Sequence, residues 1–98
     1  MKIDISKRAR LRTKKIDERW RQEADYPNLF AEELHARLTE LASMPQLGSP
    51  WPTERRPRLK RLLLEKTQYH VYFEVNECQD EIRILTVWGA RRGRTPKL

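Results

Sequence analysis

The spacing of apolar residues changes once along this 98-residue chain, and the change limits the folds open to it. From residue 9 to residue 42 apolar side chains recur every three or four positions, the period of helices that bury one face. From residue 69 to residue 88 they alternate with polar ones, as in half-buried strands. A chain this short forms one domain, so both kinds of element must share a core. The pattern predicts a single α+β domain over residues 1–98.

Two helices are expected, over residues 7–22 and 28–43. The first should begin after Ser6, since serine commonly caps helix N-termini. A short link joins the two helices, which favours an antiparallel hairpin. The apolar stripes that define them are Ala9, Thr13, Ile16 and Trp20 in the first helix, and Phe30, Leu34, Leu38, Leu41 and Ala42 in the second.

Strands are expected over residues 2–5, 59–64, 69–75 and 81–88. Residues 44–57 contain Gly48 and four prolines and read as a loop. Short links between the last three strands favour antiparallel pairing, so they should form a three-stranded sheet covered on one face by the helices. Strict alternation places Thr86 and Trp88 on the same face as Ile82 and Ile84. Residues 89–98 are expected to form a basic C-terminal tail.

The charge pattern points to an anionic partner. The formal net charge is +7, distributed as +6 over residues 1–22, −5 over residues 23–54 and +6 over residues 55–98. A positive face of this kind attracts a nucleic acid or an acidic protein surface, although an excess of charge also serves solubility.

Several classes of protein are excluded by composition. No stretch approaches the roughly 20 apolar residues of a membrane span. One cysteine and two histidines cannot make a disulfide framework or a four-ligand zinc site, so no metal or other cofactor is expected. The lone Cys78 and an N-terminus without a signal-peptide pattern favour a cytoplasmic protein.

Three ordered stretches resemble the RelE/ParE superfamily of bacterial toxins. They are Arg58–Leu64, Tyr69–Val75 and Ile82–Arg92, and the resemblance extends over nearly the whole chain. It implies a toxin of a type II toxin–antitoxin (plasmid-stabilisation) module, a growth inhibitor held in a hetero-oligomer by a cognate antitoxin.

The superfamily has two activities, and the resemblance leaves both open. RelE-like members cleave messenger RNA on the ribosome without a metal, whereas ParE-like members poison DNA gyrase. An endoribonuclease would use His70 to move a proton and Arg61 and Arg91 to stabilise the phosphate. However, the second cation of the first sheet strand is replaced by Leu63, and residues 95–98 contain no tyrosine or histidine. The ParE-like activity is therefore predicted, the RelE-like one is the alternative, and a non-toxic basic nucleic-acid-binding module is the second alternative.

The remaining site predictions concern the open face of the sheet. Arg61, His70 and Arg91 should face one another across it. The alternative is that His70 is a surface histidine paired across the sheet with Thr86 or Arg83. Trp51 and Trp88 are expected in the core. The candidates for binding the target or phosphate are Lys60, Arg92, Arg94 and Lys97, and those for binding the antitoxin are Leu62, Leu64 and Arg58.

Overall fold

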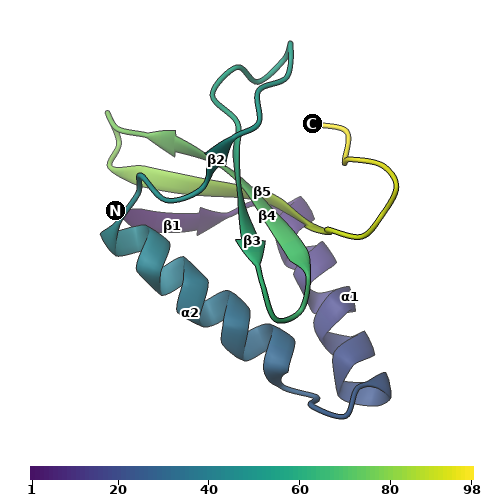
Figure 1. Ribbon diagram of the computed structural model, residues 1–98. Coiled ribbons are helices and arrows are strands. Elements are labelled where there is room, and N and C mark those ends of the chain that lie inside the picture. Colours follow the sequence, from purple (N-terminus) through teal and green to yellow (C-terminus); the bar gives the residue numbers. More distant parts are fainter.

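The computed structural model describes residues 1–98 and consists of one sheet with two helices on one of its faces (Figure 1). The helices are α1 (Lys7–Glu23) and α2 (Leu29–Ser43). The strands are β1 (Lys2–Ile5), β2 (Ser49–Pro50), β3 (Lys60–Leu64), β4 (Tyr69–Asn76) and β5 (Glu81–Gly89). This order confirms the predicted α+β class. Neither helix has the length and hydropathy needed to cross a membrane.

The sheet is larger than the predicted three strands, with the order β1-β5-β4-β3-β2. The first strand joins β5 in parallel, which places Ile3 beside Ile82 and Ile5 beside Ile84. The two-residue β2 forms within the proline-rich loop and pairs antiparallel with β3. The central strands β3, β4 and β5 are antiparallel, as their short links predicted.

A β-bulge in β5 corrects the predicted alternation of that strand. Thr86 lies opposite Tyr72 and Ile84 lies opposite Phe73, so Leu85 is an extra residue. Beyond the bulge the faces exchange: Val87 joins the core beneath the helices, and Trp88 packs on the opposite face. The prediction that Thr86 and Trp88 share the face of Ile84 is therefore wrong, because one inserted residue reverses a period of two.

The main core lies between the helices and the sheet and uses the predicted stripes. Phe30 and Leu41 of α2 are fully buried there, as is Ala9 of α1, whereas Trp20 and Leu38 pack at the edge. The complete cluster is Ala9, Ile16, Phe30, Leu34, Leu41, Leu62, Leu64, Val71, Phe73, Ile82, Ile84 and Val87.

Ser6 connects β1 to α1 and to the free edge of β5. Its Oγ accepts a hydrogen bond from the Ala9 backbone N–H at 3.1 Å, which confirms it as the N-cap. Its backbone N–H donates to the Ile84 carbonyl at 3.0 Å, and its Oγ donates to the Leu85 carbonyl at 3.1 Å. Just beyond, Arg12 Nε donates to the Val87 carbonyl at 3.2 Å. These contacts hold α1 against the part of β5 that β1 does not cover.

Glu33 of α2 fixes the turn between β3 and β4. Its carboxylate accepts hydrogen bonds from the backbone N–H of Lys66 at 2.7 Å, the backbone N–H of Thr67 at 2.9 Å and the Thr67 hydroxyl at 2.7 Å. Thr67 is buried at this contact. The backbone of the turn, including that of Lys66, is therefore held in place relative to the helices.

Candidate functional site

The face of the sheet opposite the helices is only partly open. Leu59, Tyr72 and Leu85 form a second small buried cluster there, and Trp88 and Leu98 pack against it. Leu98 reaches this cluster because residues 89–98 fold back toward the sheet instead of extending into solvent (Figure 1).

The C-terminal segment is anchored through its backbone while its cationic side chains stay exposed. Trp88 Nε1 donates to the Arg94 carbonyl at 2.9 Å, and Arg8 Nη1 donates to the Lys97 carbonyl at 2.9 Å. Pro96 is buried, whereas Arg92, Arg94 and Lys97 are exposed. Three of the four residues predicted to bind a target or phosphate therefore present charge from a fixed segment.

Arg61 and His70 lie on the same face, on the adjacent strands β3 and β4. Arg61 pairs with Tyr72 across the strands, and His70 lies two residues from Tyr72 on β4. Arg61 Nη1 is 3.4 Å from Tyr72 Oη, and the His70 and Tyr72 rings meet edge to face at 6.1 Å. The guanidinium of Arg61 also stacks on Trp51, with its carbon 3.5 Å from the ring centre.

The surroundings of His70 favour its neutral form. Burial lowers its pKa below the ordinary value of 6.5, and the positive charge of Arg61 lowers the pKa further. A neutral imidazole can accept a proton near neutral pH, so His70 is chemically able to act as a base.

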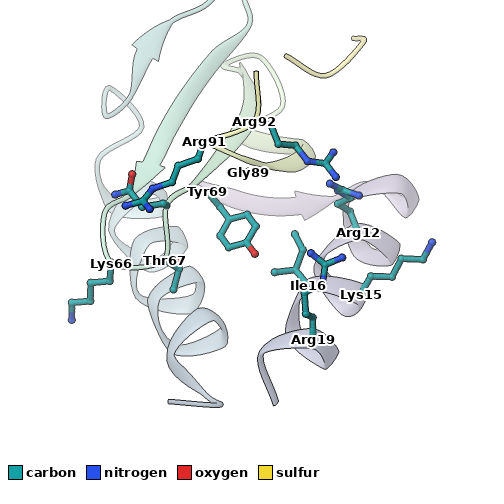
Figure 2. Close-up of a pocket in the computed structure, with 11 residues that line it drawn as sticks. Arg12, Lys15, Ile16, Arg19, Lys66, Thr67, Tyr69, Gly89, Arg91 and Arg92 are labelled. Atoms are coloured by element: carbon teal, nitrogen blue, oxygen red, sulfur yellow. The ribbon is translucent and has the colours of Figure 1, made fainter. Parts of the chain in front are cut away.

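Arg91 does not complete the predicted group of three. Its side chain lines a groove between α1 and the β3–β4 turn, whose wall includes neither Arg61 nor His70 (Figure 2). The chain turns after Gly89, where the Arg92 N–H donates to the Gly89 carbonyl at 3.3 Å. Arg91 lies within this turn and lines the groove beside α1.

Leu62 and Leu64, which were predicted to contact the antitoxin, do not lie on the exposed surface. Both are buried in the main core beneath the helices, with exposed fractions of 4% and 0%. The reason is the alternation of β3: Leu62 pairs with Val71 and Leu64 with Tyr69, so they share the helix-facing side. Arg58 precedes β3 and is exposed.

The same alternation separates Lys60 from Arg61. The Lys60 ammonium lies over the Phe73 ring at 5.6 Å and approaches the carbonyl oxygens of Pro45 and Gln46 at 3.5 and 3.4 Å. Lys60 therefore faces the end of α2 and does not join the cations of the opposite face.

Trp51 does not lie in the core as predicted. Trp51 is 36% exposed and forms part of the surface rather than the core.

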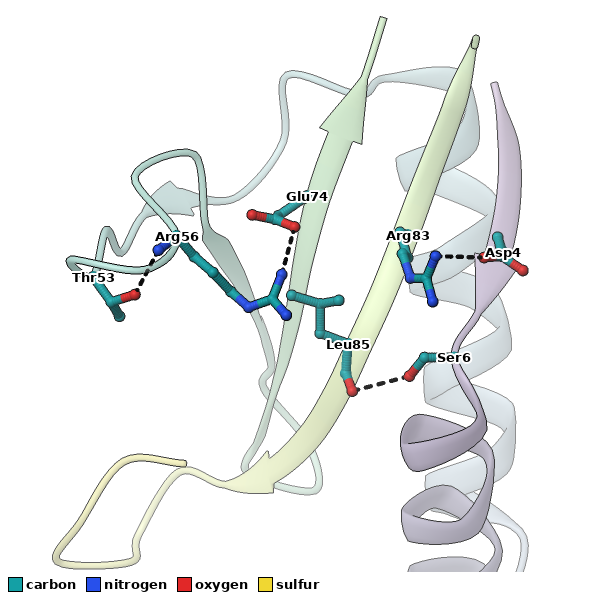
Figure 3. Close-up of polar contacts among 7 residues, drawn as sticks. All are labelled: Asp4, Ser6, Thr53, Arg56, Glu74, Arg83 and Leu85. Atoms are coloured by element: carbon teal, nitrogen blue, oxygen red, sulfur yellow. Dashed lines mark hydrogen bonds and ion pairs between the residues drawn. The ribbon is translucent and has the colours of Figure 1, made fainter. Parts of the chain in front are cut away.

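At the end of the open face near the β4–β5 turn, Arg56 pairs with Glu74 at 2.9 Å and Arg83 pairs with Asp4 at 3.9 Å (Figure 3). The cations at that end are balanced by carboxylates, in contrast to the cations around Arg91.

The groove beside Arg91 contains cations that the sequence analysis missed. Arg12, Lys15 and Arg19 line it from α1, and Lys66 lines it from the β3–β4 turn (Figure 2). The signal was present in the sequence: spacings of three and four residues put these three side chains on one helical face.

The match to a family model decides the family. Residues 3–93 match the model of the ParE toxin of the type II toxin–antitoxin system parDE. The chain belongs to the ParE toxin family. No curated protein sequence matches this ParE-family chain.

Solved structures share the fold of this ParE-family toxin. The chromosomal ParDE system of P. aeruginosa aligns with a TM-score of 0.65 at 19% identity, covering 93% of this chain and 97% of that one. The isolated E. coli RelE toxin aligns with a TM-score of 0.61 at 18% identity, covering 94% and 86%. The RelBE2 complex of Mycobacterium tuberculosis gives 0.66 at 16% identity, covering 90% and 95%. ParE and RelE structures thus resemble this fold to a similar degree.

Proposed function

We propose that this ParE-family toxin inhibits growth by binding DNA gyrase and does not cleave RNA. The match of residues 3–93 to the ParE model is the observation that carries the proposal. We also propose that its partner is a cognate antitoxin in a toxin–antitoxin hetero-oligomer, as in the ParDE system that shares its fold.

The side chains of the open face support a non-catalytic role. Cleavage by a ribose 2′-hydroxyl requires a base, an acid for the leaving oxygen and cations at the phosphate. His70 can serve as a base, but Arg61 is already stacked on Trp51. The Tyr72 hydroxyl belongs to a side chain that is only 1% exposed, and the other cation position of β3 is Leu63. The face therefore offers one proton carrier and one engaged cation.

The C-terminal segment supports a binding role. Hydrogen bonds to its backbone fix its course, so binding to an acidic surface does not have to order the backbone of this segment. Arg91, Arg92 and Arg94 are the residues on which the proposed contact with gyrase depends.

Two variants test the proposal in assays of gyrase supercoiling and growth. His70→Ala should leave gyrase inhibition and toxicity nearly unchanged. Combined charge reversal at Arg91, Arg92 and Arg94 should abolish both. The control reverses three exposed cations elsewhere, at Arg10, Lys14 and Arg55. The proposal fails if wild-type toxin does not inhibit gyrase, or if the control loses inhibition as completely as the C-terminal variant.

One observation favours the alternative, a RelE-like endoribonuclease acting on the ribosome. Arg61 lies beside a neutral His70, which is a workable pairing for proton transfer near a phosphate. In that case, cells expressing the toxin would accumulate cleaved messages. His70→Ala would then reduce cleavage by about 10²–10⁴-fold.

A further inference from the structure

The largest concentration of unpaired positive charge lies in the groove between α1 and the β3–β4 turn. The groove has a volume of about 500 Å³. No aspartate or glutamate lines it. Six cationic side chains do: Arg12, Lys15, Arg19, Lys66, Arg91 and Arg92. We call this the α1 groove.

The cations of the α1 groove come from three segments held together by the fold. Arg12 is fixed by its hydrogen bond to the Val87 carbonyl and by stacking over Trp88 at 4.8 Å. Arg92 lies over the same indole at 4.5 Å. Lys66 lies in the β3–β4 turn, where its backbone N–H donates to the Glu33 carboxylate. The charges are therefore gathered by structure rather than scattered over a flexible surface.

The cations of the groove repel one another, and the effect falls on Arg12. Burial lowers the pKa of Arg12, and the positive charges of Arg92 and Arg19 lower the pKa further. Arginine keeps its proton under these conditions, so the repulsion remains until an anion enters. A bound anion would offset the repulsion between these cations, so anion binding in the groove is electrostatically favourable.

The lining of the groove distinguishes between two kinds of anion. A peptide is usually held by apolar anchors and backbone hydrogen bonds in addition to charge. Here the only apolar contributions are Ile16 and the ring of Tyr69. A nucleic-acid backbone repeats its charge at every phosphate and needs no apolar anchor. The Tyr69 hydroxyl accepts a bond from Trp20 Nε1 at 3.1 Å and keeps its own proton to donate to a phosphate oxygen.

We propose that the α1 groove binds the sugar–phosphate backbone of a nucleic acid, with α1 on one side of the strand and Lys66 and Arg91 on the other. The α1 groove shares Arg91 and Arg92 with the proposed gyrase-binding triplet. The inference is therefore tested at Lys15 and Arg19, which line the groove but lie outside that triplet.

Two double variants of the full-length chain test the inference. Lys15→Glu with Arg19→Glu reverses two exposed groove cations on α1. Arg10→Glu with Lys14→Glu is the matched control: the same helix, spacing and charge change, but outside the groove. Fluorescence anisotropy would measure binding to a 20-base-pair DNA duplex, a 20-nucleotide single-stranded RNA and a poly-glutamate peptide, over a range of salt concentrations.

The groove variant should lose at least tenfold in affinity for a nucleic acid, and the slope of log K against log salt should fall by about 2. The control should change each quantity much less. Whichever of DNA and RNA binds more tightly identifies the source of the phosphates. Equal losses in both double variants would overturn the inference, because net charge alone would then explain binding. Poly-glutamate binding as tight as that of the nucleic acids, and lost in the groove variant, would overturn it in favour of an acidic protein ligand. These assays contain no gyrase, so their failure and that of the proposed function are distinguishable.

Discussion

The guanidinium of Arg61 lies 3.5 Å from the centre of the Trp51 ring and joins the loop between α2 and β3 to the sheet. Arg61 also faces His70 closely enough for its charge to lower the histidine's pKa. One side chain thus has two effects, one on the position of the loop and one on the protonation of the only histidine in the sheet.

Replacing Arg61 with glutamine should raise the pKa of His70. The rise should stop short of the ordinary 6.5, because burial is the larger cause of the shift and remains in the variant. NMR titration of the His70 ring measures the change. Arg83→Gln is the control, since Arg83 lies on the same face but pairs with Asp4. An equal change in both variants would contradict the assignment of the effect to Arg61.

The lowered pKa of His70 predicts a pH-dependent stability. Between the folded pKa and the unfolded value of 6.5 the unfolded chain binds more protons, so stability rises with pH in that window. Lowering the pH from 7.5 should therefore destabilise the protein through 6.5, and this contribution should level off below the folded pKa. Urea unfolding measures it, and His70→Gln should remove this component. An unchanged profile in that variant would assign the dependence to other groups.

Leu64→Ala should reduce the free energy of unfolding by about 2–5 kcal/mol, because it leaves a cavity in the core. Leu64 is fully buried, with an exposed fraction of 0%. Its neighbour Leu63 points to the opposite face and is half-buried, so Leu63→Ala should have a clearly smaller effect. Denaturant unfolding of both variants measures the two losses in free energy of unfolding. A larger effect at Leu63 would mean that the faces of β3 are assigned the wrong way round.

Glu33→Ala should loosen the β3–β4 turn. It removes the acceptor of three hydrogen bonds and leaves the buried Thr67 hydroxyl and amide without it, at a cost of about 1–3 kcal/mol. Hydrogen exchange at the amides of Lys66 and Thr67 should accelerate. Glu32→Ala, an exposed change in the same helical turn, should leave both amides protected. Unchanged exchange in the Glu33 variant would show that the turn is held by other contacts.

Periodicity predicted the fold well because each helix and strand carries its own pattern. Both helices and the four longer strands lie within two residues of their expected bounds. The misplaced residues follow from events that a local pattern does not encode. The bulge at Leu85 reverses the faces of Thr86 and Trp88, and the pairing of β1 with β5 joins residues some eighty positions apart.

The site was predicted less completely, because it depends on which strand faces and turns meet. Arg61 and His70 lie on one face as expected, since both positions follow from the alternation of β3 and β4. Arg91 lies past the end of β5, where the course of the chain is set by tertiary contacts rather than by period. The α1 groove was missed for a related reason. The spacing of its α1 cations is visible in the sequence, but only the finished fold brings them beside Lys66, Arg91 and Arg92.

The parallel pairing of β1 with β5 has a consequence for synthesis on the ribosome. The strand β1 has a single neighbour in the sheet, β5, which begins at Glu81 and ends at Gly89. Residues 2–5 therefore stay unpaired in the sheet until residues 81–84 have been synthesised, and the long loop that this pairing closes favours slow folding. A message broken before the codons of β5 yields a chain without Ile82 and Ile84, which cannot complete its core. Completion of the core is thus postponed until β5 has been translated.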